Sequence, residues 1–250
     1  MSPATRPPGR PNGDPAPQLR QSQLAGLRKR VESCTACPRL VAWRNAVAEH
    51  PPPAFAGERY WARPLAGFGD QAARLVVVGL APAAHGGNRT GRMFTGDRSG
   101  DFLVAALHRH GFASQPTSRT AGDGLRLLDS YMTAPVRCAP PDNRPMPAER
   151  DVCSKFLHEE LGLLADARVF LALGAFAYDC LARLPALREG LPRPRPRFAH
   201  GVEVRLFGGE RTIVCTYHPS QRNVFTGLLT AAMFDAVLGR CGELLEAVRG

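Results

Sequence analysis

The sequence predicts an α/β fold: a mostly parallel sheet with helices on both faces. Two runs, "RLVVVGLAP" at 74–82 and "ARVFLALG" at 167–174, are continuously apolar and rich in β-branched residues. Continuous rather than alternating hydrophobicity is typical of strands buried on both faces of a parallel sheet. Helix-like segments also alternate with the strand-like runs along the chain, as they do in folds that place helices over both faces.

The remaining elements follow from the same patterns. Helices are predicted over 18–33, 100–111, 146–164 (opened by Pro147), 175–184 and 225–248. A further strand is predicted within 127–138, and the segments 201–207 and 212–219 are predicted to form a hairpin-like pair around "GGER". No internal repeat is present, so the fold is predicted from the alternation of strand-like and helix-like segments alone.

Two segments lack the pattern of a packed element. Residues 1–16, rich in Pro and Gly, are predicted to be a disordered tail ahead of a single α/β domain over 17–250. The stretch "LREGLPRPRPRFAHG" at 187–201 is predicted to be a loop. It is either a solvated connection or a surface that contacts phosphates, and the sequence does not decide between them.

The charge balance points to a polyanionic partner. The 250 residues carry a formal net charge of +10, and only Lys29 and Lys155 among the 32 basic residues are lysine. Arginine's planar guanidinium suits phosphate, so the excess favours nucleic acid. A GC-rich genome would also favour arginine over lysine, which is the competing explanation.

Hydropathy and cysteine content exclude two classes of protein. The chain has no apolar run of about 18 residues and no signal-peptide core, so we expect a soluble, cytoplasmic protein without membrane contact. We also expect a monomer, and binding to nucleic acid would associate it with the nucleoid. Seven cysteines are an odd set, which argues against a secreted disulfide framework. Cys180, Cys215 and Cys241 lie in apolar segments and are expected to be buried as small hydrophobic residues.

A glycine-rich loop, "GLAPAAHGGNRTGRMFTGD", follows the first buried strand at 79–97. Gly86 and Gly91 have the spacing of a phosphate-binding P-loop, but Arg92 and Met93 stand where that motif needs Lys and Ser or Thr. No G-x-G-x-x-G motif is present either. The loop nevertheless leaves the carboxyl end of a central strand, where open α/β sheets bind ligands. We therefore expect a ligand other than a nucleotide cofactor.

Four cysteines have the pattern of a metal centre. Cys34 and Cys37 form a C-x2-C pair, and Cys138 and Cys153 lie fifteen residues apart. Four thiolates can hold a zinc ion or a [4Fe–4S] cluster, whereas a zinc ribbon would show two tight pairs. Four free buried thiols are the simpler alternative. We favour a structural centre, because no flavin or nicotinamide motif accompanies the cysteines.

Four motifs in order resemble the family 5, or type B, uracil-DNA glycosylases of bacteria and archaea. They are "CTACPRL", the glycine-rich loop, "VRCAPPDNRPMPAERDVC" and "TYHPSQRNVFTG", and the resemblance extends from about Leu24 to Leu238. It implies a three-layer fold with a mainly parallel four-stranded central sheet. It also implies a [4Fe–4S] cluster held by Cys34, Cys37, Cys138 and Cys153.

The resemblance also implies a role for the glycine-rich loop. A glycosylase flips its target nucleotide out of the duplex and encloses the base. The residues expected to enclose the base are Gly79, Ala81, Ala83, His85, Gly86 and Phe94, with Phe94 stacking on it. The residues expected to contact DNA are Arg89, Arg92, Ser220, Gln221, Arg222 and Asn223, although Ser220 could simply cap a helix.

The catalytic residues implied by the resemblance are Asp97, His218 and Asn143. Cleavage leaves negative charge on the departing base, which His218 would stabilise by hydrogen bonding. Asp97 would orient the attacking water, with Asp101 as the alternative, and Asn143 would contact the base or the water. Stricter uracil-DNA glycosylases carry an acid or amide in "GLAPAAHG" and an asparagine where Ala134 stands. Fewer fixed polar partners predict tolerance for hypoxanthine and other deaminated bases.

The expected reaction is removal of uracil from DNA in base-excision repair by a monofunctional enzyme. Neither lysine is placed to form a Schiff base, so the abasic site would stay uncut. Three alternatives remain open: a non-catalytic DNA-binding module with a structural four-cysteine zinc site, a nucleotide-dependent enzyme and an electron-transfer protein.

Overall fold

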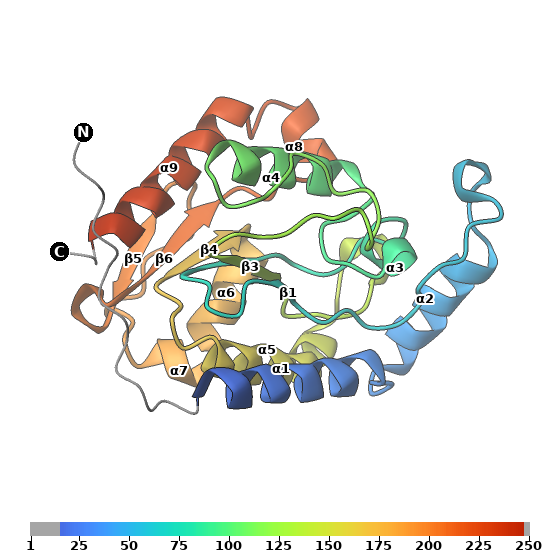
Figure 1. Ribbon diagram of the computed structural model, residues 1–250, viewed down its shortest axis with the longest axis horizontal. Helices are drawn as coiled ribbons and strands as arrows, with labels where there is room; N and C mark the ends of the chain where they lie inside the picture. The colour runs from blue at the N-terminus through green and yellow to red at the C-terminus, as the bar shows by residue number, and fades with distance from the viewer. Residues whose placement is uncertain (1–15, 248–250) are drawn as a thin grey trace, which may run out of the picture.

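A computed structural model describes residues 16–247 (Figure 1). The predicted tail therefore lies outside the described residues, except for Ala16, which begins the first helix. Its helices are α1 (Ala16–Glu32), α2 (Pro38–Glu49), α3 (Gly87–Thr90), α4 (Arg98–Arg109), α5 (Pro147–Leu163), α6 (Ala175–Arg183), α7 (Pro185–Arg188), α8 (Gln221–Phe225) and α9 (Ala231–Ala247). Short 3-10 turns occur at Pro53–Phe55, Pro141–Asn143 and Phe207–Gly209.

The sheet has the strand order β1-β3-β2-β4-β6-β5. Its strands are β1 (Phe68–Gly69), β2 (Leu75–Val78), β3 (Ser130–Thr133), β4 (Val169–Leu173), β5 (Glu203–Leu206) and β6 (Arg211–Thr216). The four central strands β3, β2, β4 and β6 are parallel, while β1 and β5 pair antiparallel at the two edges. The mainly parallel sheet is thus confirmed. The resemblance implied four strands, and the sheet has six because β1 and β5 extend it at its edges.

Helices cover both faces of the sheet, so the expected three layers are confirmed (Figure 1). Successive residues of β2 face opposite sides: Leu75 and Val77 join the core beneath α4 and α9, while Val76 and Val78 join the core beneath α1, α5 and α6. β4 and β6 alternate in the same way. This burial on both faces is why the strand sequences are continuously apolar.

Two element boundaries differ from the prediction, and one helix was not predicted. The C-terminal helix was expected from Phe225, but the chain forms the short α8 first and α9 begins only at Ala231. Within 127–138 only Ser130–Thr133 is strand. Helix α2 was not predicted, since the sequence around it was interpreted only as a cysteine motif. Pro38 occupies its first turn, where a missing backbone N–H costs nothing.

Two further predictions are confirmed, the hairpin and the burial of three cysteines. β5 and β6 pair antiparallel, as expected for the hairpin. Cys180, Cys215 and Cys241 are buried among apolar side chains. No helix within residues 16–247 is long and apolar enough to cross a membrane.

Candidate active site

A cavity of about 510 Å³ opens at the carboxyl ends of the parallel strands, as expected for an open α/β sheet. The loops that follow β2, β3 and β6 build its walls. Its lining residues are Leu80, Ala81, Pro82, Ala83, Met93, Phe94, Asp97, Arg98, Ser99, Ala134, Asn143, His218, Ser220, Gln221 and Arg222. The fold therefore gathers the three residues predicted to be catalytic, 46 and 75 positions apart along the chain, around one cavity.

Phe94 presents its ring to this cavity from a strained backbone. Its φ is +49°, a left-handed value that a bulky residue rarely adopts. A Cβ atom on Gly79 would lie 2.5 Å from Phe94 Cζ, and one on Gly100 would lie 2.3 Å from the Phe94 carbonyl oxygen. Gly79 lets the ring approach the end of β2 closely, and Gly100 lets the Phe94 backbone approach α4. Gly79 therefore shapes the cavity without lining it.

Asp97 lies at the N-terminus of α4. Its Oδ1 accepts a hydrogen bond from the Gly100 backbone N–H (2.9 Å), which makes Asp97 the N-cap of that helix. Its Oδ2 lies so close to Gly86 that a Cβ atom there would approach within 1.9 Å. Burial raises the pKa of Asp97 above its ordinary value, against hydrogen bonds from the backbone of Gly100 and Ser99 that lower it. The side chain is thus fixed, half-buried and less acidic than usual.

His218 follows β6 and lines the same cavity as Asp97. Burial lowers the pKa of His218 to about 4, so the imidazole is neutral at physiological pH. The Asn223 side-chain amide donates to the His218 carbonyl oxygen at 2.9 Å. Gly174, with φ +89°, passes close to the His218 Cβ. The histidine is therefore held as an uncharged hydrogen-bonding group.

Asn143 reaches the same cavity from the loop after β3. Both Asn143 and the preceding Asp142 have left-handed backbones, with φ values of 55° and 54°. Asn and Asp tolerate this region better than other non-glycine residues. Two such residues in succession bend the chain sharply and bring the Asn143 amide to the cavity rim.

A more open groove of about 1060 Å³ adjoins the cavity. The cavity and the groove share five lining residues: Ala83, Asp97, Arg98, Asn143 and Gln221. Asp101 is exposed and lines the groove only, whereas Asp97 lines both, which favours Asp97 as the acid nearest an enclosed base.

His85 and Gly86, both expected to enclose the base, also line the groove rather than the cavity. The His85 ring stacks on Phe55 with centroids 5.8 Å apart, and its Nδ1 shares a hydrogen bond with the Tyr60 hydroxyl at 2.9 Å. Burial lowers the pKa of His85 as well. Ala81, Ala83 and Phe94 do line the cavity.

The two arginines of the glycine-rich loop brace the loop itself. Arg92, expected to contact DNA, is only 6% exposed and pairs with Asp123 at 2.9 Å, while its Nε donates to Thr95 Oγ1. That expectation is therefore corrected, because a buried, fully paired guanidinium has no face left for a phosphate. Arg89 donates to the carbonyl oxygens of His85 (2.7 Å) and Gly96 (2.9 Å) and lines the groove.

Helix α8 forms part of the cavity rim. Ser220 caps it by accepting a hydrogen bond from the Asn223 N–H at 3.3 Å, so the capping alternative accounts for Ser220. Gln221 and Arg222 are exposed and line the cavity. Asn223 is directed to the His218 carbonyl, as described above, rather than outward.

Two neighbouring residues beside the cavity, Phe225 and Arg98, were missed by the sequence analysis. Phe225 is 66% exposed, the most exposed of the large hydrophobic side chains in the described part of the chain. It lies one helical turn after Gln221, and the Arg98 guanidinium lies 5.2 Å from its ring centroid. A five-residue helix is too short for hydrophobic periodicity to separate an exposed phenylalanine from a core one.

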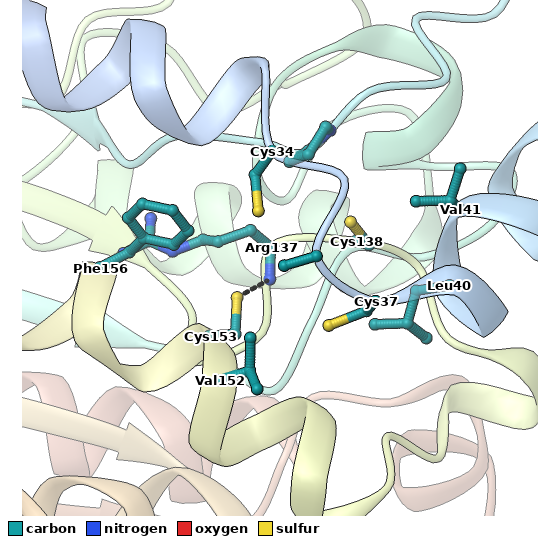
Figure 2. Close-up of a pocket in the computed structure, with 11 residues that line it drawn as sticks. Cys34, Cys37, Leu40, Val41, Arg137, Cys138, Val152, Cys153 and Phe156 are labelled. Atoms are coloured by element: carbon teal, nitrogen blue, oxygen red, sulfur yellow. Dashed lines mark hydrogen bonds between the residues drawn. The ribbon is translucent and has the colours of Figure 1, made fainter.

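The four cysteines line one small cavity, with their sulfur atoms turned toward a common space (Figure 2). Cys34 and Cys37 come from the α1–α2 connection, Cys138 follows β3, and Cys153 lies on α5. The Arg137 backbone N–H donates to Cys153 Sγ (3.3 Å), and Arg44 Nη1 donates to Cys138 Sγ (3.1 Å).

The chemistry of these thiols is that of buried groups. Burial raises the pKa of Cys138 to about 11 and that of Cys153 to about 12, so as free thiols both are protonated at neutral pH. A bound metal would displace those protons. Within residues 16–247, no three Cys, His, Asp or Glu side chains are arranged to hold a single metal ion.

Comparison with known proteins assigns the family. The profile described as "Uracil DNA glycosylase superfamily" matches residues 66–240. The "Type-5 uracil-DNA glycosylase" of Mycobacterium tuberculosis is 51% identical over 222 residues, covering 88% of this chain and 81% of that protein. The Thermus thermophilus protein of the same name is 50% identical over 208 residues, covering 83% and 92%.

A type-4 relative is more distant. The "Type-4 uracil-DNA glycosylase" of Thermotoga maritima is 28% identical over 202 residues, covering 80% of this chain and 83% of that protein. The matched profile spans the strands and loops that build the cavity. The chain therefore belongs to the uracil-DNA glycosylase superfamily, and its half-identical relatives place it in the type-5 group.

Proposed function

We propose that this protein is a hydrolase that cleaves the N-glycosidic bond of uracil in DNA, as the names of its type-5 relatives state for those proteins. The observation that carries the proposal is the content of the cavity. An aromatic face, a half-buried carboxylate and a neutral imidazole surround one space at the end of the sheet. These are the groups that an enclosed base and an attacking water require.

The flipped base would stack on Phe94, whose ring faces the cavity. As the glycosidic bond breaks, electrons pass to the base and positive charge develops on the sugar. His218, neutral because of its burial, would donate a hydrogen bond to the anionic base without first losing a proton. Its preorganisation by Asn223 supports this role.

Asp97 would orient and deprotonate the water that attacks the sugar carbon. One carboxylate oxygen is committed to capping α4, which leaves the other for the water. A pKa raised by burial makes this carboxylate a better base than an exposed aspartate. Asn143, at the cavity rim, would hold the water or the base edge.

The reaction would stop at the abasic site. Lys29 lies on α1, and Lys155 on α5 packs against Phe156 with its Nζ 5.2 Å from the ring centroid. Neither lysine lines the cavity, so no lysine amine is available there to form a Schiff base with the sugar.

Breadth of substrate is the finer part of the proposal. Ala134 lines the cavity and offers no side-chain polar group to select one base edge. A cavity with fewer fixed partners discriminates less, so hypoxanthine and other deaminated bases are proposed as additional substrates.

DNA is proposed to contact the exposed side of α8 and its neighbour. Gln221 and Arg222 lie at the cavity rim, and Phe225 continues the same helix face outward beside Arg98. Apolar side chains on DNA-binding surfaces can insert between base steps and hold the duplex open.

A [4Fe–4S] cluster is proposed at Cys34, Cys37, Cys138 and Cys153. Their arrangement fits it, because four thiols from three segments converge on one cavity and two of them accept N–H hydrogen bonds, as cluster sulfurs do. When bound, the cluster would serve as a structural staple that ties the α1–α2 connection to the sheet and to α5.

The proposal is tested by incubating the protein with single-stranded and duplex oligonucleotides that contain one uracil, followed by alkali and separation of the products. Strand breaks that appear only after alkali are expected. Breaks without alkali would contradict the monofunctional reaction. No breaks from protein with its iron intact would favour the non-catalytic DNA-binding module, and an ATP requirement would favour the nucleotide-dependent alternative.

A further inference from the structure

Arg44 is a buried cation beside the cysteines. It lies on α2, its exposed fraction is 5%, and its Nη1 lies 3.1 Å from Cys138 Sγ and 3.5 Å from the Cys34 carbonyl oxygen. Its Nε is buried without a hydrogen-bond partner. No carboxylate within residues 16–247 pairs with Arg44.

The other arginine at this centre, Arg137, is neutralised differently. It is 1% exposed and forms an ion pair with Glu160 at 2.6 Å. A buried charge without a counter-charge destabilises the folded state. Arg44 has no such carboxylate, and the group beside it that can carry negative charge is the Cys138 sulfur, together with the centre to which that sulfur belongs.

We infer that Arg44 is the counter-cation of the cysteine centre. This inference rests on the proposed cluster: four thiolates around a [4Fe–4S] core leave net negative charge, and the guanidinium offsets part of it at the Cys138 sulfur. The unpaired Nε–H is a spare donor on the same side chain. Hydrogen bonds to the cluster sulfurs and positive charge beside them raise the reduction potential of the cluster.

Arg44 also connects this centre to the base cavity. Its carbonyl oxygen accepts a hydrogen bond from Asn88 Nδ2 at 3.2 Å. Asn88, buried on α3, donates its backbone N–H to the Ala83 carbonyl oxygen at 3.1 Å, and Ala83 lines the cavity. Arg44 is therefore a positioning residue whose backbone holds the glycine-rich loop while its side chain balances the cysteine sulfurs.

The test compares Arg44→Gln, Arg44→Lys and the control Arg28→Gln, which removes an equal charge from an exposed position on α1. Each protein is purified without oxygen, and iron and acid-labile sulfide per chain are measured with the cluster reduction potential. We expect Arg44→Gln to lose at least half of its iron and to hold any remaining cluster at a lower potential. Arg44→Lys keeps the charge and is expected to recover most of the iron, and Arg28→Gln is expected to match the wild type.

An Arg44→Gln protein with wild-type iron content and an unchanged potential would overturn the inference. If Arg44→Gln does not fold, the iron content of Arg44→Lys decides, since a cation at this position should retain most of the iron, and a folded Arg44→Lys protein without iron contradicts the assignment. Wild-type protein that contains no iron would instead overturn the cluster proposal itself, so the two failures are distinguishable.

Discussion

The base cavity and the cysteine centre lie on the same molecule but are built in opposite ways. Much of the cavity wall comes from one continuous loop after β2, and missing side chains give that loop its shape: Gly79 makes room for Phe94, and Gly86 makes room for Asp97. The cysteine centre gathers side chains from three distant segments, and the contacts of the sulfurs define it. Substitutions in the cavity should therefore reduce activity in a folded protein, whereas substitutions at the cysteines should reduce assembly.

Replacing Asp97 with Asn should separate loss of activity from loss of assembly most strongly. Asn is as good a helix N-cap as Asp, so α4 should keep its start while the carboxylate is lost. We expect kcat for uracil release to fall about 10²–10⁴-fold, the range for a general base, with an unchanged Tm. Single-turnover kinetics and thermal melting measure both, and Asp101→Asn is the matched control. Equal losses in the two variants would contradict the assignment of Asp97.

The pH profile follows from the same two groups. Burial places the pKa of Asp97 above its ordinary 3.8 and that of His218 at about 4. Above both values the carboxylate is charged and the imidazole is neutral, so activity should fall as the pH drops through the pKa of Asp97. The acid limb should be absent from the residual activity of Asp97→Asn. An inflection near pH 6.5 that disappears in His218→Asn would show instead that His218 acts as a protonated group.

Gly86→Ala tests whether absent side chains shape the cavity. The new methyl group would lie 1.9 Å from Asp97 Oδ2, so the carboxylate has to move. A displacement near 1 Å in a catalytic group costs about 10²-fold in rate. Gly122→Ala, where no atom lies within 4 Å of the new Cβ, is the control and should keep full activity. Wild-type kinetics in Gly86→Ala would mean that Asp97 need not be held in this position.

Phe225→Ala tests the proposed contact with duplex DNA. A side chain that holds the stack open matters only where a stack exists, so we expect about a tenfold loss on duplex substrate and little change on single strands, within the range of base–aromatic stacking energies. Comparing kcat/KM on the two substrates measures this ratio. Phe207→Ala, on the β5–β6 turn, removes another exposed phenylalanine away from the cavity. A similar loss on both substrates would assign Phe225 a structural role.

Ala134→Asn should have the smallest effect. The added amide restores a polar group to the cavity wall, so release of hypoxanthine should fall relative to uracil by about fivefold, the value of roughly one hydrogen bond. Competition between the two substrates in one reaction gives the ratio directly. An unchanged ratio would show that Ala134 does not determine base selectivity.

The sequence by itself determined the α/β class, the buried strands and the loops that carry the site. Those features depend on local hydrophobic patterns and on motifs such as the glycine-rich loop, which are legible without knowing what packs against them. The C-x2-C pair was also identifiable in this way, whereas the histidine after β6 was identified only through the resemblance to the type B uracil-DNA glycosylases.

Only the tertiary structure decided which polar residues face the cavity. Arg92 and Arg89 occur in the same loop as Asp97, yet both arginines brace the loop, because Asp123 and the carbonyls of His85 and Gly96 lie within their reach. Arg44, Phe225 and the edge strand β1 escaped prediction for a related reason. Burial, exposure and pairing depend on residues that are distant in the chain. A single sequence does not show which of these residues become neighbours in the folded protein.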